Sequence, residues 1–381
     1  MKILLSAMAA VAETAGPASR CRLLDTELAK AGAEVATCMA GDVNYKPIDG
    51  IKNFFLDVPM PFGLPKVIAT RTFPIAQKLG ITSRKTVASF DDVLNITGNI
   101  NYNYLKKSVN SIRAAIQEFK PDIVYSEFNM SAFIAAKIEK ITTYATVSYP
   151  SQYEYAHSTK LAKGLNRLLD EFSIDRVDSA LRLFDWADKA FCPSISELEP
   201  IKKDNVIFCG ALKTVTPKKL TRNKILVYMG NGTISASKTE QVVTQAFAGS
   251  VYEVYIASKY LQKKDAGNIH IAPRWDFDQL LHESVCFINH GGQNSVVDGL
   301  IHGVPQIVVP GKVFERKYNA KSLTDNDAGI AVDYYDFTAD HIRTIANQII
   351  HSSQMRQNAL ALGKKLTEGG GVGVIVENIM R

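Results

Sequence analysis

Short apolar runs alternate along the chain with longer segments in which apolar residues recur every three to four positions. The apolar runs predict buried strands at residues 2–6, 34–38, 123–126, 144–148, 188–193, 225–229, 254–257, 285–288 and 306–309. The helical spacing predicts helices at residues 20–31, 110–119, 131–140, 160–184, 238–247, 295–301, 339–350 and 354–366. Strands that alternate with helices in this way are typical of an α/β protein with parallel sheets.

The alternation falls into two halves, and a chain of 381 residues is long for one domain but sufficient for two. We therefore predict two doubly wound, Rossmann-like domains that face a cleft. The expected first domain spans residues 1–209, a polar linker spans 210–223, and the expected second domain spans 224–360. The remaining residues, 361–381, contain a glycine-rich hinge and a last helix.

A glycine-rich turn joins the predicted strand 285–288 to the predicted helix 295–301. It reads His290-Gly291-Gly292-Gln293-Asn294-Ser295. Glycine pairs allow a sharp turn and a close approach of a ligand to the backbone. The N–H groups and the positive dipole end of a helix N-terminus bind phosphate, and the His, Asn and Ser side chains add donors. Asp298, one turn further along, can accept hydrogen bonds from sugar hydroxyls.

The second half of the chain contains another strand, glycine turn and helix. The strand 225–229 is followed by Gly230-Asn231-Gly232-Thr233 and then by the helix 238–247. Further along, the strand 306–309 ends at Pro310-Gly311, and Glu315 and Arg316 follow on a predicted loop.

Together, residues 287–331 closely resemble the donor-site signature of GT-B glycosyltransferases, the superfamily that contains the UDP-glycosyltransferases. The family pattern is matched in order by His290-Gly291-Gly292, Asn294-Ser295, Asp298, Gly303-Val304-Pro305, Pro310, Glu315-Arg316 and Asn319-Ala320. The resemblance implies that the turn 290–295 holds the diphosphate of a nucleotide-sugar donor and that Asp298 holds its ribose. The turn 230–233 would face the same diphosphate from across the cleft.

The resemblance also implies roles for the base and the sugar of the donor. Arg274 and Trp275 would hold the nucleotide base, with core packing as the alternative for Trp275. Glu315 and Arg316 would contact the transferred sugar, although the family usually has Gln where this chain has Arg316. The C-terminal helix of the family crosses back onto the first domain, and the same is expected here.

The first domain departs from the family pattern at the expected catalytic base. The family commonly has Gly-His after the first strand, and the His deprotonates the acceptor. Here Gly16-Pro17 occupies that place, and proline has no titratable group. Glu127, which follows the strand 123–126, takes the place of the acid that orients the family's His. The first candidate for the base is therefore Glu127, whose position at a strand end predicts that it points into the cleft. The second is Glu13, which lies on the predicted loop 9–18.

Composition narrows the class of protein. Apolar residues make up 46% of the chain and charged residues 22%, which is ordinary for a soluble globular protein. No apolar run approaches the length that spans a bilayer. The scattered cysteines lack CxxC spacing, which indicates reduced thiols in a cytoplasmic protein and no zinc site. They are Cys21, Cys38, Cys192, Cys209 and Cys286.

The net charge of +6 is unevenly distributed, because residues 52–113 contain nine basic and three acidic residues. This segment predicts a solvated basic face, with attraction to an anionic acceptor or to the inner face of the membrane as the alternative. The basic residues are not interleaved with stacking aromatic residues, so we do not expect nucleic-acid binding.

These features predict an inverting glycosyltransferase that moves a sugar from a nucleotide-diphosphate sugar to a hydroxyl acceptor. UDP-sugars are the first candidate donors. The acceptor classes considered are a small molecule, a glycolipid and a cell-envelope precursor. No metal or cofactor is expected, because helix N-termini and His290 can stabilise the leaving diphosphate. Two alternatives stay open: a sugar-nucleotide hydrolase or 2-epimerase of the same fold, and a silent binding partner that lost the base.

Overall fold

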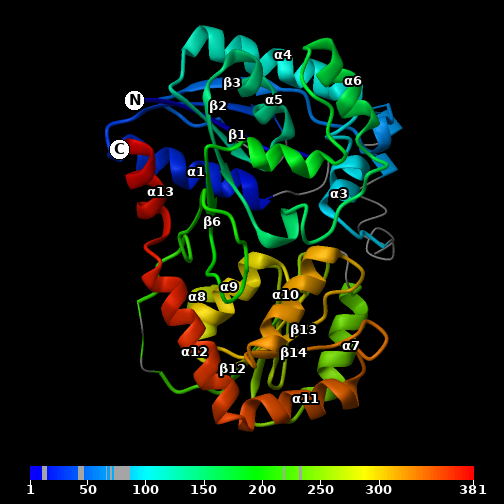
Figure 1. Cartoon of the computed structure of the whole chain (residues 1–381). Coiled ribbons are helices and arrows are strands. Elements are labelled where there is room, and N and C mark those ends of the chain that lie inside the picture. The colour runs from blue at the N-terminus through cyan, green and yellow to red at the C-terminus, as the bar shows by residue number, and fades with distance from the viewer. Residues whose placement is uncertain are drawn as a thin grey trace.

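The computed structural model describes residues 1–10, 15–41, 47–65, 67–68, 71–72, 86–216, 218, 220–230 and 234–381. It contains two seven-stranded sheets with helices packed against them, one near each end of the molecule (Figure 1). The two α/β domains predicted from the sequence are therefore confirmed.

The first sheet is parallel throughout, in the order β3-β2-β1-β4-β5-β6-β7. Its strands are β1 (Lys2–Ala7), β2 (Glu34–Ala40), β3 (Lys52–Leu56), β4 (Ile123–Glu127), β5 (Thr142–Thr146), β6 (Lys189–Cys192) and β7 (Val206–Phe208). The first domain also contains α1 (Ala15–Lys30), α3 (Phe90–Thr97), α4 (Tyr102–Phe119), α5 (Met130–Glu139), α6 (Lys163–Glu171) and the short helices Pro61–Gly63, Tyr149–Ser151 and Ala180–Trp186. Residues on both faces of β1 are fully buried, which explains its continuous apolar run.

The second sheet has the order β10-β11-β9-β8-β12-β13-β14, and only β10 runs antiparallel to its neighbour among the described pairings. Its strands are β8 (Lys224–Tyr228), β9 (Glu253–Ala257), β10 (Lys264–Ala266), β11 (Ile269–Ala272), β12 (Ser284–Asn289), β13 (Gln306–Val308) and β14 (Gly329–Ala331). The helices of this part are α7 (Ala236–Phe247), α8 (Phe277–His282), α9 (Gln293–Ile301), α10 (Phe314–Asp325), α11 (Ala339–His351) and α12 (Ser353–Glu368).

The last helix, α13 (Gly371–Met380), lies against the first domain rather than the second (Figure 1). Its Ile375 and Ile379 are buried in one apolar cluster with Leu24 and Leu28 of α1. The chain reaches this position from α12, which packs on α9 and runs through residue 360, where the sequence had suggested a boundary. The C-terminal segment thus connects the two domains.

Three local predictions were wrong. The long helix expected at 160–184 ends at Glu171, because the side chain of Asn166 bonds both backbone groups of Val177 and holds the chain in a loop. The loop expected at 9–18 gives way to α1 at Ala15. Pro17 fits this first turn because its missing N–H would have no partner inside the helix. Glu315 and Arg316 lie in the first turn of α10 and not on a loop.

Candidate functional site

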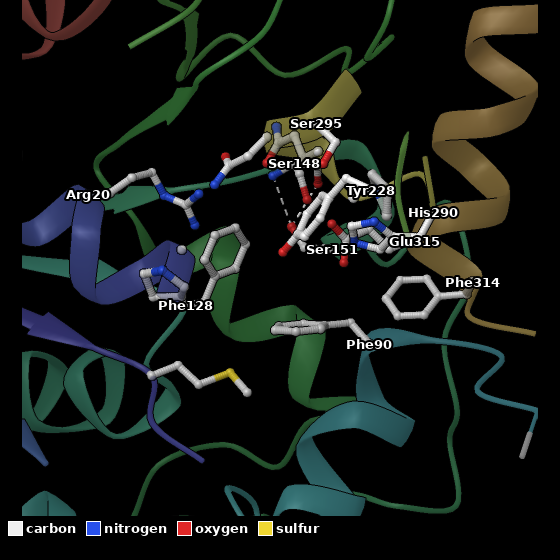
Figure 2. Close-up of a pocket in the computed structure, with 17 residues that line it drawn as sticks. Arg20, Phe90, Phe128, Ser148, Ser151, Tyr228, His290, Ser295, Phe314 and Glu315 are labelled. Carbon is white, nitrogen blue, oxygen red and sulfur yellow. Dashed lines mark hydrogen bonds between the residues drawn. The ribbon is translucent and has the colours of Figure 1, made fainter. Parts of the chain in front are cut away.

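The strand order of each sheet reverses at one point, between β1 and β4 in the first sheet and between β8 and β12 in the second. Open α/β sheets bind ligands outside the carboxyl ends of the strands at such a point. Met8 and Phe128 directly follow β1 and β4, and Tyr228 and His290 lie at the ends of β8 and β12. All four line one cleft of about 360 Å³ between the domains (Figure 2).

Helix α9 presents an uncapped N-terminus to this cleft. Gly292 stands at the N-cap position without a capping side chain, and the first turn contains no acidic residue. Asn294 and Ser295 line the cleft together with Gly292, and Ser295 is only 8% exposed. The first backbone N–H groups of α9 and its positive dipole end are therefore available to an anion.

The imidazole of His290 occupies the space between two glycines. A Cβ on Gly230 would lie 2.9 Å from Cε1 of His290, and a Cβ on Gly292 would lie 2.8 Å from its Nε2. Tyr228 packs edge-on against the ring, with 5.5 Å between the ring centroids. Burial lowers the pKa of His290 to about 3, and the nearby Arg316 adds to the shift. His290 is thus neutral at physiological pH and carries one ring N–H.

Side-chain amides fix the turn at Gly291, whose φ is 80°. The N–H of Gly291 donates to Oδ1 of Asn289 at 2.8 Å, and its carbonyl accepts from Nδ2 of Asn319 at 2.8 Å. Asn289 in turn donates to Oε1 of Gln306 at 2.8 Å. Gln306 is fully buried and had been interpreted only as a strand residue, because nothing in its local sequence indicates this long-range bond.

Glu315 and Arg316 project from the first turn of α10, and Glu315 lines the cleft. Burial raises the pKa of Glu315, and the positive charges of Arg316 and Arg20 oppose that rise. Burial lowers the pKa of Arg316, and Glu315 opposes this shift. The carboxyl group of Glu315, on the helix that follows β13, therefore lines the same cleft as the N-terminus of α9. We call that N-terminus, with Gly292, Asn294 and Ser295, the cradle.

Asp298 lies one turn along α9, in a second cavity of about 260 Å³ that adjoins the first. Both cavities are lined by Gly16, Arg20, Gln293 and Asn294. The carboxylate of Asp298 is paired with Nζ of Lys213 at 2.8 Å. A ribose at Asp298 would share that carboxylate with Lys213.

Arg274 and Trp275 precede α8 and line neither of these two cavities. Arg274 is exposed, whereas the indole N–H of Trp275 donates to the carbonyl of Ile256 at 3.1 Å. The ring of Trp275 also packs edge-on against Tyr255, with 5.1 Å between centroids. Packing against the sheet thus accounts for Trp275, and a contact with a nucleotide base stays a prediction.

Glu127 ends β4 beneath the cleft and does not line it. Its carboxylate, which is fully buried, accepts hydrogen bonds from Nε of Arg20 and from the hydroxyl of Thr146. Burial raises the pKa of Glu127, and the charge of Arg20 is the largest opposing effect. The acid that was expected to orient a His is instead paired with an arginine of α1. The other candidate base, Glu13, lies outside the described residues, as do Asn231, Gly232 and Thr233.

Comparisons with known proteins agree with this geometry. Residues 253–368 match the sequence model of the family described as "Erythromycin biosynthesis protein CIII-like, C-terminal domain". The uncharacterized UDP-glucosyltransferase YdhE of Bacillus subtilis is 25% identical over 190 residues, which cover 46% of this chain and 48% of YdhE. UDP-glucuronosyltransferase 1-2 of Mus musculus is 22% identical over 175 residues, 42% of this chain and 32% of that protein. The matches thus span half or less of these relatives.

Solved structures resemble the whole chain. The calicheamicin glycosyltransferase CalG4 has a TM-score of 0.74 at 14% identity, over 100% of this chain and 97% of its own. The glycosyltransferase VinC, solved in complex with dTDP, has a TM-score of 0.70 at 13% identity, over 100% and 99% of the two chains. The chain therefore has the GT-B fold, and part of its sequence is similar to UDP-glycosyltransferases.

In this GT-B protein, the segment that matches the family model contains α9 and α10, and therefore the cradle, His290 and Glu315. The first domain carries the departures. Pro17 lines the cleft where a His was expected, and Arg20 follows it one turn later on α1. The two halves of the site therefore differ in how closely they follow the expected pattern.

Sequence reasoning missed three parts of the site that come from distant segments. Phe90, Phe128 and Phe314 form an apolar wall of the cleft. The ring centroid of Phe90 lies 5.8 Å from that of Phe128 and 6.5 Å from that of Phe314. Glu199, which is 3% exposed, accepts a hydrogen bond from Nε2 of Gln293 at 3.1 Å and so joins the first domain to α9. Arg20 had been interpreted only as the first residue of the helix predicted at residues 20–31. Aromatic and charged residues in loops give no periodic signal that would reveal such contacts.

One group of described residues, Asp278, His282 and His302, places its possible metal-ligating atoms within 4.8 Å of one another. All four imidazole nitrogens already lie within hydrogen-bond distance of an oxygen atom. None of the three residues lines the cleft or the cavity at Asp298, so this group lies outside the site described above. None of the described helices is both long and apolar enough to cross a membrane.

Proposed function

We propose that this protein transfers a sugar from a nucleotide-diphosphate sugar to a hydroxyl group of an acceptor, with inversion and without a metal ion. The observation that carries the proposal is the uncapped N-terminus of α9, which opens into the interdomain cleft beside a neutral His290 and Ser295. A UDP-sugar is the first candidate donor, in keeping with the named activities of the sequence relatives. A dTDP-sugar is the second, since the similar VinC structure holds dTDP.

The cradle supplies what the leaving group needs. As the glycosidic bond to the diphosphate breaks, negative charge grows on the terminal phosphate oxygens. Backbone N–H groups of α9, the Ser295 hydroxyl and one N–H of His290 can donate to those oxygens, and they are already in position before the reaction. Glu315 would accept hydrogen bonds from hydroxyls of the sugar and present the anomeric carbon to the acceptor.

The acceptor hydroxyl must lose its proton as it attacks, so the reaction needs a base close to that hydroxyl. Glu127 is poorly placed for that role, because both of its oxygens are bonded and neither faces the cleft. Glu13 belongs to the segment between Met8 and Gly16, two residues that do line the cleft. Glu127 was the first choice from the sequence; we now propose Glu13, the second candidate, as the base and assign Glu127 a positioning role.

The acceptor side of the cleft is largely apolar, with Met8, Phe90, Phe128 and Phe314 along its wall. This wall favours an acceptor that carries an apolar group next to its hydroxyl. Within segment 52–113, Lys66, Lys78, Arg84 and Lys85 lie outside the described residues. The described part of the segment adds little support for an anionic acceptor or a membrane surface. Lys52, Lys106 and Arg113 within it are paired with Glu118, Glu171 and Glu139.

The test is to incubate the protein with UDP- and dTDP-sugars, with and without a panel of apolar alcohols and phenols, and to measure nucleoside diphosphate release. Release that requires an acceptor, together with a glycoside of inverted anomeric configuration in NMR spectra, supports the proposal. Release without an acceptor indicates a hydrolase or epimerase. Binding without release in any mixture indicates a silent binding protein.

The base is tested by single-turnover kinetics with the acceptor found in that panel. Glu13→Gln should slow the transfer by about a hundredfold or more, the lower end of what base catalysis contributes. Donor affinity should be unchanged in that variant. Normal transfer by Glu13→Gln would remove Glu13 from this role.

A further inference from the structure

Arg20 is a cation held rigidly in the wall of the cleft. It lies in the second turn of α1, and its side chain is 14% exposed. Nε donates to the buried Glu127, and the guanidinium carbon lies 5.7 Å from the ring centroid of Phe128. The guanidinium also packs over Gly16, where an added Cβ would lie 3.5 Å from Nη1. These contacts fix the plane of the guanidinium and leave its outer edge for the cleft.

The outer edge of this guanidinium has no protein acceptor within the described part of the chain, where the bond from Nε is the only one that Arg20 makes. Arg20 lines both cavities, and so do Gln293 and Asn294 at the start of α9. Figure 2 shows Arg20 on one side of the cleft and Ser295, His290 and Glu315 on the other. A positive side chain of the first domain therefore faces the positive end of a helix in the second domain.

Two positive groups that face each other across a gap favour an anion between them. A diphosphate has the right charge, and a guanidinium whose Nε is already engaged can still offer two N–H groups to one phosphate. We propose that Arg20, positioned by Glu127, binds the donor diphosphate from the first domain. This inference rests on the proposed function, since it assigns a further residue to the same donor site.

The assignment gives the Arg20–Glu127 pair a role in catalysis. The family uses a His that takes a proton and an acid that orients it; in this chain Pro17 stands at the place of the His, and the acid Glu127 instead holds the cation of Arg20. The cation would stabilise the charge that develops on the departing diphosphate. Because the diphosphate would then contact both domains, donor binding would also hold the two domains against each other.

The test compares the affinities of UDP and of uridine, which lacks the phosphates, by calorimetry. Arg20→Met alone would leave Glu127 buried and unpaired, which is strongly destabilising, so the variant used is Arg20→Met with Glu127→Gln. We expect the UDP dissociation constant to rise by about tenfold to about a hundredfold, because a charge-assisted hydrogen bond is lost. Uridine affinity should not change.

Two further variants keep the test informative if the double variant does not fold. Arg20→Lys keeps the charge but loses the planar fork, and it should show a smaller loss for UDP and none for uridine. Glu127→Gln keeps Arg20 but removes the carboxylate that holds it. This variant should lower the affinity for UDP without changing the affinity for uridine, whereas loss of a purely structural contact would not separate the two. Arg22→Met, an exposed position of the same helix that does not line the cleft, is the matched control.

The outcomes separate this inference from the proposed function. If the wild-type protein binds neither UDP nor dTDP, the proposed function fails. If it binds UDP and the Arg20 variants bind it equally well, the proposed function stands and the inference about Arg20 is overturned. Unchanged UDP affinity with a raised KM for the acceptor would also overturn it, because Arg20 would then serve the acceptor.

Discussion

The ring of His290 touches the places where Gly230 and Gly292 would carry a side chain, so the donor cradle depends on the smallest residue at two turns. The sequence placed Gly292 and His290 in one motif and Gly230 in another. It could not show that the glycines make room for the imidazole, because Gly230 lies on a different strand end. In the same way, Arg20 and Glu127 are 107 residues apart, and only the folded chain reveals that they pair.

Gly292→Ala tests the packing of His290 directly. The new Cβ would lie 2.8 Å from Nε2 of His290, so the ring must shift from its present position. We expect UDP affinity to fall by about tenfold or more, as for loss of a hydrogen bond to a charged group, while the protein stays folded. Gly373→Ala is the matched control, because a Cβ there meets no atom within 4 Å. Equal UDP affinity of both variants in calorimetry would contradict this account of the cradle.

At the scale of elements, the sequence predicted strands better than the segments between them. The strands around the site were located because burial on both faces gives continuous apolar runs. The helix predicted over 160–184 ends early, because two hydrogen bonds between the side chain of Asn166 and the backbone of Val177 hold the following residues in a loop despite their helical spacing. Helix α10 was missed because its first turn carries three consecutive charged residues and no capping side chain.

Helix α10 should set the choice of sugar through Arg316. This residue opposes the rise in the pKa of Glu315, so Arg316→Gln should favour the protonated carboxyl group. A protonated carboxyl donates a hydrogen bond where a carboxylate only accepts, which changes the hydroxyl pattern that the site recognises. We expect the kcat/KM ratios among UDP-glucose, UDP-galactose and UDP-N-acetylglucosamine to change by about tenfold. Lys317→Gln, exposed on the same helix, is the control, and an unchanged ranking in Arg316→Gln would exclude this role.

At the scale of the whole molecule, the two domains and their order could be predicted, but their contacts could not. Glu199 of the first domain bonds Gln293 of α9 and the N–H of Tyr149. The backbone of Val87 also pairs with the segment before α10. Such contacts depend on how two folded units meet, and no local periodicity encodes them. Through these contacts the first domain holds the start of α9 and the segment before α10 in position.

Glu199 should make the stability of the assembled protein depend on pH. Burial raises the pKa of its carboxyl group from 4.5 to about 8. Between these values the unfolded chain releases the proton and the native state keeps it, so the free energy of unfolding should fall as pH rises. In Glu199→Gln this contribution is absent. The melting temperature of the wild type relative to Glu199→Gln should therefore decline from about pH 5 to about pH 8, and parallel curves would refute the assignment.

The central claim is that the interdomain cleft binds a nucleoside diphosphate at the N-terminus of α9. The most direct measurement is a calorimetric titration of UDP and dTDP into the wild-type protein and into His290→Ala. The account predicts one saturable site per chain for at least one of the two nucleotides. It also predicts a dissociation constant raised by about tenfold to about a hundredfold in His290→Ala, with the fold unchanged in circular dichroism. No binding by the wild type, or equal affinity in both proteins, would contradict it.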